Sequence, residues 1–346
     1  MRVYHLDAGS SGSHPVPVER PVPTPGPGEV RIRVVAVSLN FRDLLVAESA
    51  HAGQIPHGRI PLSDAAGIVD AVGGGVASRQ LGERVMVSFF PAWLDGAFRS
   101  HYMSSALGGA RSDGVLAEYI VVPAAAVVPI AAGMSFIEAS TLPCAAVTAW
   151  HGLVVRAGLG SQDTVVIPGT GGVALFALQM TKKYGARGIL LSSSDAKLER
   201  ARALGVDECI NYRKTPAWEH EVLALTGGEG ASIVLELGGA DTYQRSLDCL
   251  APAGRIVQVG VLTGFGAHPK LDRLQSLNAD IVGVTVGSTR HLLQVSQFYA
   301  QHGLHPVVDS VFGFDEVPQA YSHLRDKTHM GKVVVQIVDP SGADLG

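Results

Sequence analysis

The chain has 346 residues, of which 47% are apolar and 17% are charged, and its formal net charge is −4. This composition is typical of a globular protein with room for two domains, and it excludes a disordered or strongly basic chain. The sequence has no long basic run and no apolar stretch as long as a membrane span, so we expect neither a nucleic-acid nor a membrane partner. The N-terminal residues lack the charged start and apolar run of a signal peptide, which favours a cytoplasmic location.

Strands and turns dominate the predicted structure of the first 130 residues. Residues 30–36 alternate apolar with more polar side chains, as a half-buried strand does. Further strands are predicted at 67–72, 84–88 and 116–122, each bounded by glycine or proline. Between the last two lies the segment 89–113, and loops of that length are uncommon unless they serve a site.

A strand, a glycine-rich turn and a helix follow one another from residue 164. Residues 164–167 are a short β-branched run, as expected for a buried parallel strand, and apolar residues recur at helical spacing over 173–184. Between them, Gly169-x-Gly171-x-x-Ala174 fits the glycine fingerprint of a dinucleotide site. A second apolar strand is predicted at 189–191. The order strand, turn, helix, strand strengthens a motif that is weak by itself.

Helices alternate with short apolar strands through the rest of this half of the chain. Helices are predicted at 195–204, 218–225 and 241–250, and strands at 208–210, 233–237, 255–259 and 281–286. Counted from residue 164, the strands number six, which a complete dinucleotide-binding domain needs, and the alternation predicts a parallel sheet covered on both faces. The tail adds helices at 291–300 and 316–324 and a strand at 332–338, which we expect to pack on the N-terminal domain.

Cysteine and histidine spacing argues against a metal or disulfide framework. Cys144, Cys209 and Cys249 lie far apart and form no Cys-x-x-Cys pair, which predicts buried free thiols. His51 and His57 lie in a segment rich in glycine and proline, and such a pair is typical of solvated surface rather than of a metal site.

Several motifs together resemble the medium-chain dehydrogenase/reductase superfamily. They are SLNFRD at 38–43, DAAG at 64–67, GERV at 82–85, GVLAEY at 114–119, the glycine turn and HMGKVV at 329–334. The resemblance covers nearly the whole chain. It implies an α/β fold with a GroES-like β-rich catalytic domain, residues 1–128 completed by 288–346, and a Rossmann domain with a doubly wound parallel sheet, residues 129–287.

The resemblance also bears on zinc. In the zinc alcohol dehydrogenases, cysteine stands at the position of Asn40, histidine at that of Ser63, and a second cysteine at that of Cys144. An amide, a hydroxyl and one thiol are a poor set for a metal that prefers Cys, His or carboxylate ligands. The chain therefore resembles the zinc-independent branch, typified by quinone oxidoreductases, and we expect no metal.

The residues after the second strand of the dinucleotide domain favour NADPH. A site for NAD usually has Asp or Glu there, whereas this strand runs into serines, with Ser193 and Ser194 as donors and Lys197 as a cation. Tyr212 stands where NADPH-dependent quinone reductases place a tyrosine over the 2′-phosphate. Two alternatives stay open: the serines cap the next helix, or Asp195 reaches the ribose.

The resemblance implies further cofactor contacts at the glycine turn, after the later strands and beside the nicotinamide. These are Thr170, Gly171, Gly172, Val173, Gly238, Gly239, Val261, Leu262, Gly287, Ser288, Asn40, Phe41 and Thr148. Glycines that follow strands are also ordinary turn residues.

The candidate catalytic residues, by position only, are Asn40, Ser63 and Thr148, with Asp64 beside them. Enzymes of this branch often lack a dedicated acid and take the proton from water. Residues 47–61 are predicted as a loop that contains no tyrosine, although the family often has one there, so His51 and His57 are alternatives.

We therefore predict a cytoplasmic, zinc-independent oxidoreductase that transfers hydride from NADPH to a small quinone or α,β-unsaturated carbonyl. The alternatives are an NADP-dependent alcohol or carbonyl dehydrogenase of the same fold and a non-catalytic NADPH-binding sensor. A methyltransferase also has a glycine-rich turn after its first strand but lacks the β-rich half found here. The resemblance further implies a homodimer built by edge pairing of the Rossmann sheets.

Overall fold

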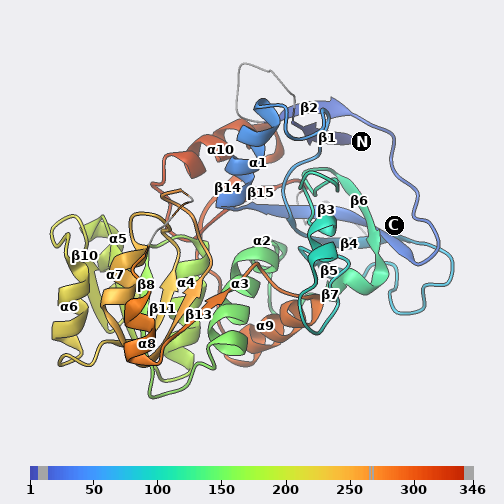
Figure 1. Ribbon diagram of the computed structural model, residues 1–346. Coiled ribbons are helices and arrows are strands. Elements are labelled where there is room, and N and C mark those ends of the chain that lie inside the picture. Colours follow the sequence, from blue (N-terminus) through green and yellow to red (C-terminus); the bar gives the residue numbers. More distant parts are fainter. Residues whose placement is uncertain (7–14, 265, 267–268, 339–346) are drawn as a thin grey trace. The chain divides into compact units, whose positions relative to one another are not determined.

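The computed structural model describes residues 1–6, 15–264, 266 and 269–338, and it divides into two compact units (Figure 1). Unit 1 comprises Met1–Val147 and Gly287–Gly346, and unit 2 comprises Thr148–Val286. The predicted fold class is confirmed, since a mixed β-rich unit accompanies a unit built on a parallel sheet. Segment 129–147, which the sequence assigns to the second domain, clusters with unit 1 because α2 (Phe136–Ser140) packs against the sheet of that unit.

Unit 1 is built on a seven-stranded sheet with strand order β14-β15-β3-β4-β5-β7, in which β6 also pairs with β3. β1 and β2 form a separate antiparallel pair. Besides α2, its elements are β1 (Arg2–His5), β2 (Val16–Glu19), β3 (Glu29–Leu39), α1 (Phe41–His51), β4 (Asp64–Val72), β5 (Arg84–Val87), η1 (Ser100–Ser105), β6 (Tyr119–Pro123), η2 (Ala124–Ala126), β7 (Val127–Pro129), η3 (Leu142–Ala146), α9 (Thr289–Gln301), β14 (Val308–Gly313), η5 (Phe314–Glu316), α10 (Val317–Arg325) and β15 (Lys332–Gln336).

The tail of the chain completes the sheet of unit 1, as predicted. β15 runs antiparallel to β3, with Val334 opposite Ser38, and β14 pairs in parallel with β15. β3 alternates between buried and half-buried residues at its start, as its pattern predicts, but from Val34 onward every residue is buried. There α2 packs on the strand, and Ser38 Oγ donates a hydrogen bond to the Ser140 carbonyl (2.9 Å).

Four parts of unit 1 differ from the sequence prediction. The segment from 47 to 51 is helical, because α1 begins after Asn40, whose backbone N–H donates to the Asp43 carboxylate (2.8 Å). Strand β14 and the β1–β2 pair were not predicted. β6 begins only at Tyr119. The Leu116 carbonyl accepts a hydrogen bond from the Tyr4 N–H (2.9 Å) instead of pairing with a strand of the seven-stranded sheet.

Unit 2 contains a six-stranded parallel sheet with strand order β10-β9-β8-β11-β12-β13, which confirms the predicted number of strands. The helix predicted at 241–250 is shorter in the structure, where only 243–248 is helical. The elements are α3 (Val147–Ala149) at the unit boundary, η4 (Trp150–Arg156), β8 (Thr164–Pro168), α4 (Gly172–Lys183), β9 (Arg187–Ser192), α5 (Asp195–Ala203), β10 (Glu208–Asn211), α6 (Trp218–Leu225), β11 (Ala231–Glu236), α7 (Tyr243–Asp248), β12 (Leu250–Gln258), α8 (Asp272–Leu277) and β13 (Asp280–Gly283).

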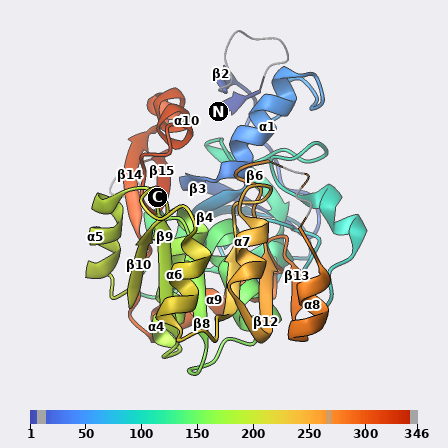
Figure 2. The same cartoon turned by 60° about the vertical axis from the view of Figure 1, so that its left-hand side comes forward.

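Both faces of this parallel sheet are buried at its central strands β8, β9 and β11. Helices α6 and α7 lie in front of it in Figure 2, and their side chains Trp218 and Tyr243 share a core with Val166 of β8. The neighbouring residues Val165 and Ile167, which point to the opposite face, are fully buried as well. Burial on both faces explains why these strands are continuous apolar runs. Within the described ranges, none of the helices is long and apolar enough to cross a bilayer.

Candidate functional site

The glycine turn of unit 2 joins β8 to α4, as the sequence predicts. Gly169 has a φ of 96°, a left-handed conformation that favours glycine, and Gly171 is the N-cap of α4. A Cβ added at Gly169 or at Gly171 would meet no heavy atom within 4 Å, so the backbone of the turn faces open space. The first N–H groups of a helix have no partner within it and attract anions. The turn therefore fits the pyrophosphate of a dinucleotide.

The residues predicted to distinguish the 2′-phosphate of NADPH from the 2′-hydroxyl of NAD lie at the ends of neighbouring strands. Ser192 of β9 lies opposite Asn211 of β10, and the Tyr212 N–H donates to the Ser192 carbonyl (3.1 Å). Tyr212 is 41% exposed. Ser194 Oγ caps α5 by accepting the Lys197 N–H (3.4 Å), as in the capping alternative. Accepting that bond does not use the hydroxyl hydrogen of Ser194.

Asp195, the carboxylate that would repel a 2′-phosphate at this site, has two partners. Lys214 Nζ lies 2.7 Å from one of its oxygens, and Asn211 Nδ2 donates to the other (2.7 Å). The hydrogen bond from Lys214 is the largest cause that lowers the pKa of Asp195, followed by the bond from Asn211. Lys214 was not predicted as a site residue. Its only signal in the sequence is its place in the basic pair that follows Tyr212.

The predicted glycines after β11 serve the packing of their own loop. A Cβ on Gly238 would lie 2.1 Å from Thr242 Oγ1, and Gly239 has a φ of 100°. Both positions therefore require glycine whether or not a ligand binds. Val261 and Leu262 follow β12 in the adjacent loop, and Leu262 is 42% exposed.

The remaining predicted cofactor residues divide between the units. Thr148 lies in unit 2 and is buried. Gly287 and Ser288 lie in unit 1, where Ser288 Oγ caps α9 by accepting the His291 N–H (3.3 Å). Gly287 is packed so closely that a Cβ would come within 2.6 Å of Val147 Cγ1. Asn40 and Phe41 also belong to unit 1.

In unit 1, polar side chains gather around a buried carboxylate, and we call this group the Asp64 cluster. Asp64 is fully buried; its Oδ2 accepts from Asn40 Nδ2 (3.0 Å), and its Oδ1 accepts from Ser63 Oγ (2.8 Å). Two of the predicted catalytic residues therefore share one carboxylate. The members of the cluster are Ser38, Asn40, Ser63, Asp64, Cys144 and Lys332.

Lys332 supplies the positive charge of the cluster, and sequence reasoning missed it. Its ammonium donates to the Leu39 carbonyl (2.7 Å) and to Asn40 Oδ1 (2.5 Å), and it lies 3.6 Å from Asp64 Oδ2. Only 3% of its side chain is exposed. The one usable signal was a lysine at the start of an apolar strand, where a charged residue needs a partner.

Lys332 and Asp64 together fix the orientation of the Asn40 amide. The ammonium requires the amide oxygen on one side, and the carboxylate requires the amide nitrogen on the other. Asn40 is half-buried, whereas Ser63 is fully buried and its hydroxyl hydrogen is directed at Asp64. Of these two candidates, Asn40 is the residue that is not fully buried, so it is the one that could meet a substrate.

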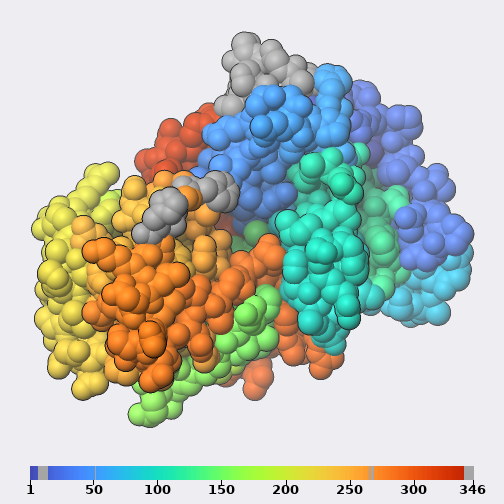
Figure 3. Space-filling view, in the orientation of Figure 1, coloured from blue at the N-terminus to red at the C-terminus, as the bar shows by residue number. Residues whose placement is uncertain are grey.

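The long segment 89–113 (teal in Figure 3) packs closely against the backbone of Leu62, just before Ser63. Leu62 is buried with a φ of 68°, an unfavourable conformation for a residue with a side chain. Gly108 lies so close that a Cβ would be 2.5 Å from the Leu62 carbonyl oxygen. Arg42 Nη1 also donates to the Leu107 carbonyl (3.1 Å). The segment therefore supports the strained peptide beside the Asp64 cluster, and such strain is often found at functional sites.

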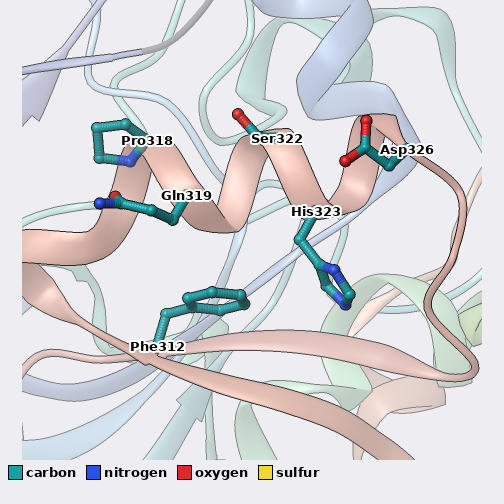
Figure 4. Close-up of a pocket in the computed structure, with 6 residues that line it drawn as sticks. All are labelled: Phe312, Pro318, Gln319, Ser322, His323 and Asp326. Atoms are coloured by element: carbon teal, nitrogen blue, oxygen red, sulfur yellow. The ribbon is translucent and has the colours of Figure 1, made fainter.

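A separate open pocket of about 390 Å³ lies between α10 and β14 in unit 1, and Figure 4 shows His323 pointing from the helix toward the strand that carries Phe312. His323 Nε2 lies 2.8 Å from Asp309 Oδ2 and 3.3 Å from Ser310 Oγ. A nucleophilic triad uses one ring nitrogen for the carboxylate and the other for the serine. Here one nitrogen meets both, and Ser310 donates to Asp309 (2.6 Å), so the group is not arranged for nucleophilic catalysis.

Two family models match the chain in the order of its predicted domains. Residues 26–132 match the alcohol dehydrogenase GroES-like domain, and residues 172–301 match the zinc-binding dehydrogenase model. The zinc-type alcohol dehydrogenase-like protein C1773.06c of Schizosaccharomyces pombe is 40% identical over 313 residues, which cover 87% of this chain and 89% of that protein. The chain therefore belongs to the medium-chain dehydrogenase/reductase superfamily and is an oxidoreductase by class.

Two further similar proteins differ in how much of their own length this chain covers. A solved structure of an NAD-dependent alcohol dehydrogenase superposes with a TM-score of 0.87 at 32% identity, covering 98% of this chain and 100% of the other. A phenolphthiocerol/phthiocerol polyketide synthase of Mycobacterium tuberculosis is 30% identical over 313 residues, and this chain spans 13% of its length.

The name of the second family model implies zinc, but the residues present do not fit that metal. Among the described residues there is no group of three or more His, Cys, Asp or Glu side chains placed to hold a metal ion. At the predicted family position, the Asn40 oxygen is engaged by the Lys332 ammonium. Burial raises the pKa of the Cys144 thiol, which opposes the thiolate form that zinc requires. A cation already adjacent to the donors further disfavours a second one.

Proposed function

We propose that this chain is a zinc-independent oxidoreductase that transfers hydride from NADPH to a quinone or an α,β-unsaturated carbonyl. The observation that carries the proposal is the Asp64 cluster, which presents an oriented amide and a lysine in place of metal ligands. Without a metal, polarisation of a carbonyl oxygen depends on hydrogen-bond donors. The acceptor class rests on the resemblance to the zinc-independent branch of the superfamily.

Within this proposal, unit 2 holds the cofactor. The glycine turn and the start of α4 would bind the pyrophosphate, and Ser193, Ser194 and Tyr212 would surround the 2′-phosphate. The pairing of Asp195 with Lys214 supports NADPH over NADH, because it compensates the charge that would repel a phosphate. The bound nicotinamide would supply the hydride at C4.

Asn40 would act on the substrate side. Its Nδ2 has a second N–H beyond the one given to Asp64, and a carbonyl oxygen can accept it. Thr148 remains the other candidate by position, and Ser63 would act through Asp64. We assign no dedicated acid, so the proton would come from water.

The runner-up is an alcohol or carbonyl dehydrogenase of the same fold. It is favoured by the names of the similar proteins, which include a zinc-type alcohol dehydrogenase-like protein and an NAD-dependent alcohol dehydrogenase. Its substrates would be simple aldehydes and ketones.

Steady-state and stopped-flow oxidation of NADPH and NADH against quinones, enones and aldehydes tests the proposal. We expect a KM for NADPH at least about tenfold below that for NADH, because a 2′-phosphate gains charge-assisted bonds worth over 1 kcal/mol. Quinones or enones should be reduced faster than simple aldehydes. Preference for NADH, or reduction of aldehydes alone, would favour the runner-up. Tight NADPH binding without turnover of any acceptor would identify a non-catalytic sensor.

Removal of metal should leave activity intact. After dialysis against EDTA, we expect kcat to stay within about twofold, since no step of the proposal needs a Lewis acid. Mass spectrometry of the purified protein should find far less than one zinc per chain, and a zinc-dependent dehydrogenase treated in parallel serves as the control. Loss of activity with EDTA and its recovery with zinc would contradict the prediction.

We also propose that the protein is a cytoplasmic homodimer. The exposed edge strand β13 of the six-stranded sheet is the natural place for edge pairing between two copies. Light scattering measures the molecular mass in solution. A mass of one chain would overturn this part of the proposal.

A further inference from the structure

Glu236, the last residue of β11, is a buried carboxylate surrounded by donors from the loop that follows it and from α7. Its Oε1 accepts the N–H groups of Gly238 (2.7 Å) and Gly239 (2.8 Å) and the hydroxyl of Thr242 (2.6 Å). Its Oε2 accepts the Ser246 hydroxyl. A buried carboxylate is costly unless it is bonded, and these four donors offset that cost.

The backbone of Glu236 holds a second loop. Its carbonyl accepts the N–H groups of Val259 (3.0 Å) and Gly260 (3.0 Å), which begin the loop after β12. The two loops also bond to each other, because the Thr263 N–H donates to the Gly238 carbonyl (2.8 Å). One residue therefore anchors both segment 237–242 and segment 259–264.

The charge of this carboxylate also acts on its surroundings. Burial, and secondarily the charge of Glu236, raise the pKa of Tyr243 to about 12. The Tyr243 hydroxyl stays protonated at neutral pH and donates to Gln258 Oε1 at the end of β12 (3.2 Å). This bond links α7 to the strand that begins the second loop.

Both loops lie at the carboxyl ends of neighbouring parallel strands, since Glu236 of β11 is opposite Gln258 of β12. In an open α/β sheet, ligands bind at this edge. Four of the predicted cofactor residues, Gly238, Gly239, Val261 and Leu262, are in these two loops. We infer that Glu236 is a positioning residue, which holds both loops in the shape that the dinucleotide binds. This inference rests on the proposed cofactor.

The test compares Glu236→Gln with Glu219→Gln, which alters a second buried carboxylate of unit 2. Gln keeps the shape of Glu236, and its amide can donate to a rotated Ser246 hydroxyl, so folding should persist. The three bonds to Oε1 become neutral and weaker, and we expect the Kd for NADPH to rise about tenfold. KM for NADPH should rise more than kcat falls. Glu219 instead bonds Arg245 (2.7 and 2.8 Å), so its variant should melt earlier with an unchanged Kd.

Hydrogen exchange gives a readout that does not depend on turnover. In the wild type, NADPH should slow exchange in peptides that cover 237–242 and 259–264. In Glu236→Gln, the peptide that covers 237–242 should exchange faster without ligand, because its bonds to the side chain are weakened, and 259–264 should follow to a smaller extent through the bond between the Thr263 N–H and the Gly238 carbonyl. The inference is overturned if Glu236→Gln melts earlier with the same Kd as the wild type, or if NADPH protects neither loop. A wild-type protein that binds neither NADPH nor NADH would overturn the proposed function and this inference with it.

Discussion

Replacing Lys332 by Met should destabilise the protein by about 3–5 kcal/mol, because it leaves the buried carboxylate of Asp64 without its cation. The ammonium of Lys332 is also the donor for the Leu39 carbonyl and for Asn40 Oδ1, and both would lose a bond. Urea unfolding followed by circular dichroism at pH 7 measures the effect. Turnover should fall as well, because the Asn40 amide is no longer held on its oxygen side.

Two comparisons make the Lys332 prediction specific. Lys182→Met breaks an ion pair with a shorter separation, 2.8 Å from Asp207, but the two side chains are 36% and 33% exposed. That variant should lose at most about 1 kcal/mol, since water screens exposed pairs. The double variant Lys332→Met with Asp64→Asn should be more stable than Lys332→Met alone, because no unpaired charge remains. If Lys332→Met is as mild as Lys182→Met, the Asp64 cluster does not depend on its lysine.

The stability of the wild type relative to an Asp43→Asn variant should fall by about 2 kcal/mol between pH 4 and pH 7. Burial raises the pKa of Asp43 to about 6 from 3.8, although Arg42 and the Asn40 N–H oppose the shift. The folded protein therefore binds this proton more tightly than the unfolded chain. The contribution of Asp43 to stability is greatest below pH 3.8 and is lost as the pH rises through 6. Urea midpoints for both proteins across this range measure the difference.

Asp309 provides a control of opposite sign. Burial would raise the pKa of Asp309, but hydrogen bonds from Ser310, His323 and the Met330 N–H outweigh it, and the pKa is lowered. Its stabilisation is present above the unfolded pKa and is lost as the pH falls through the folded one. The wild type should thus gain stability relative to Asp309→Asn as the pH rises from acid. An Asp43 difference that stays constant, or changes in the same direction as that of Asp309, would contradict the prediction.

The sequence alone determined those features that depend on neighbouring residues. The strand, glycine turn and helix around Gly169 are predicted from spacing, because each signal lies within a few residues of the next. The six parallel strands of unit 2 follow from the same alternation. Helix α1 was not predicted although its signal is local, because the loop-like residues that follow obscure the capping carboxylate of Asp43.

Tertiary structure alone decided how remote residues meet. The register of β15 on β3 brings Lys332 to Asn40 across 292 positions of sequence, and the order of the strands in the sheet is not written in their apolar pattern. The closure of its following loop likewise decided that Glu236 is a buried anchor rather than an exposed carboxylate. Periodicity shows which residues are buried, whereas the partners of buried charges depend on strand pairing and loop closure, which bring distant parts of the chain together.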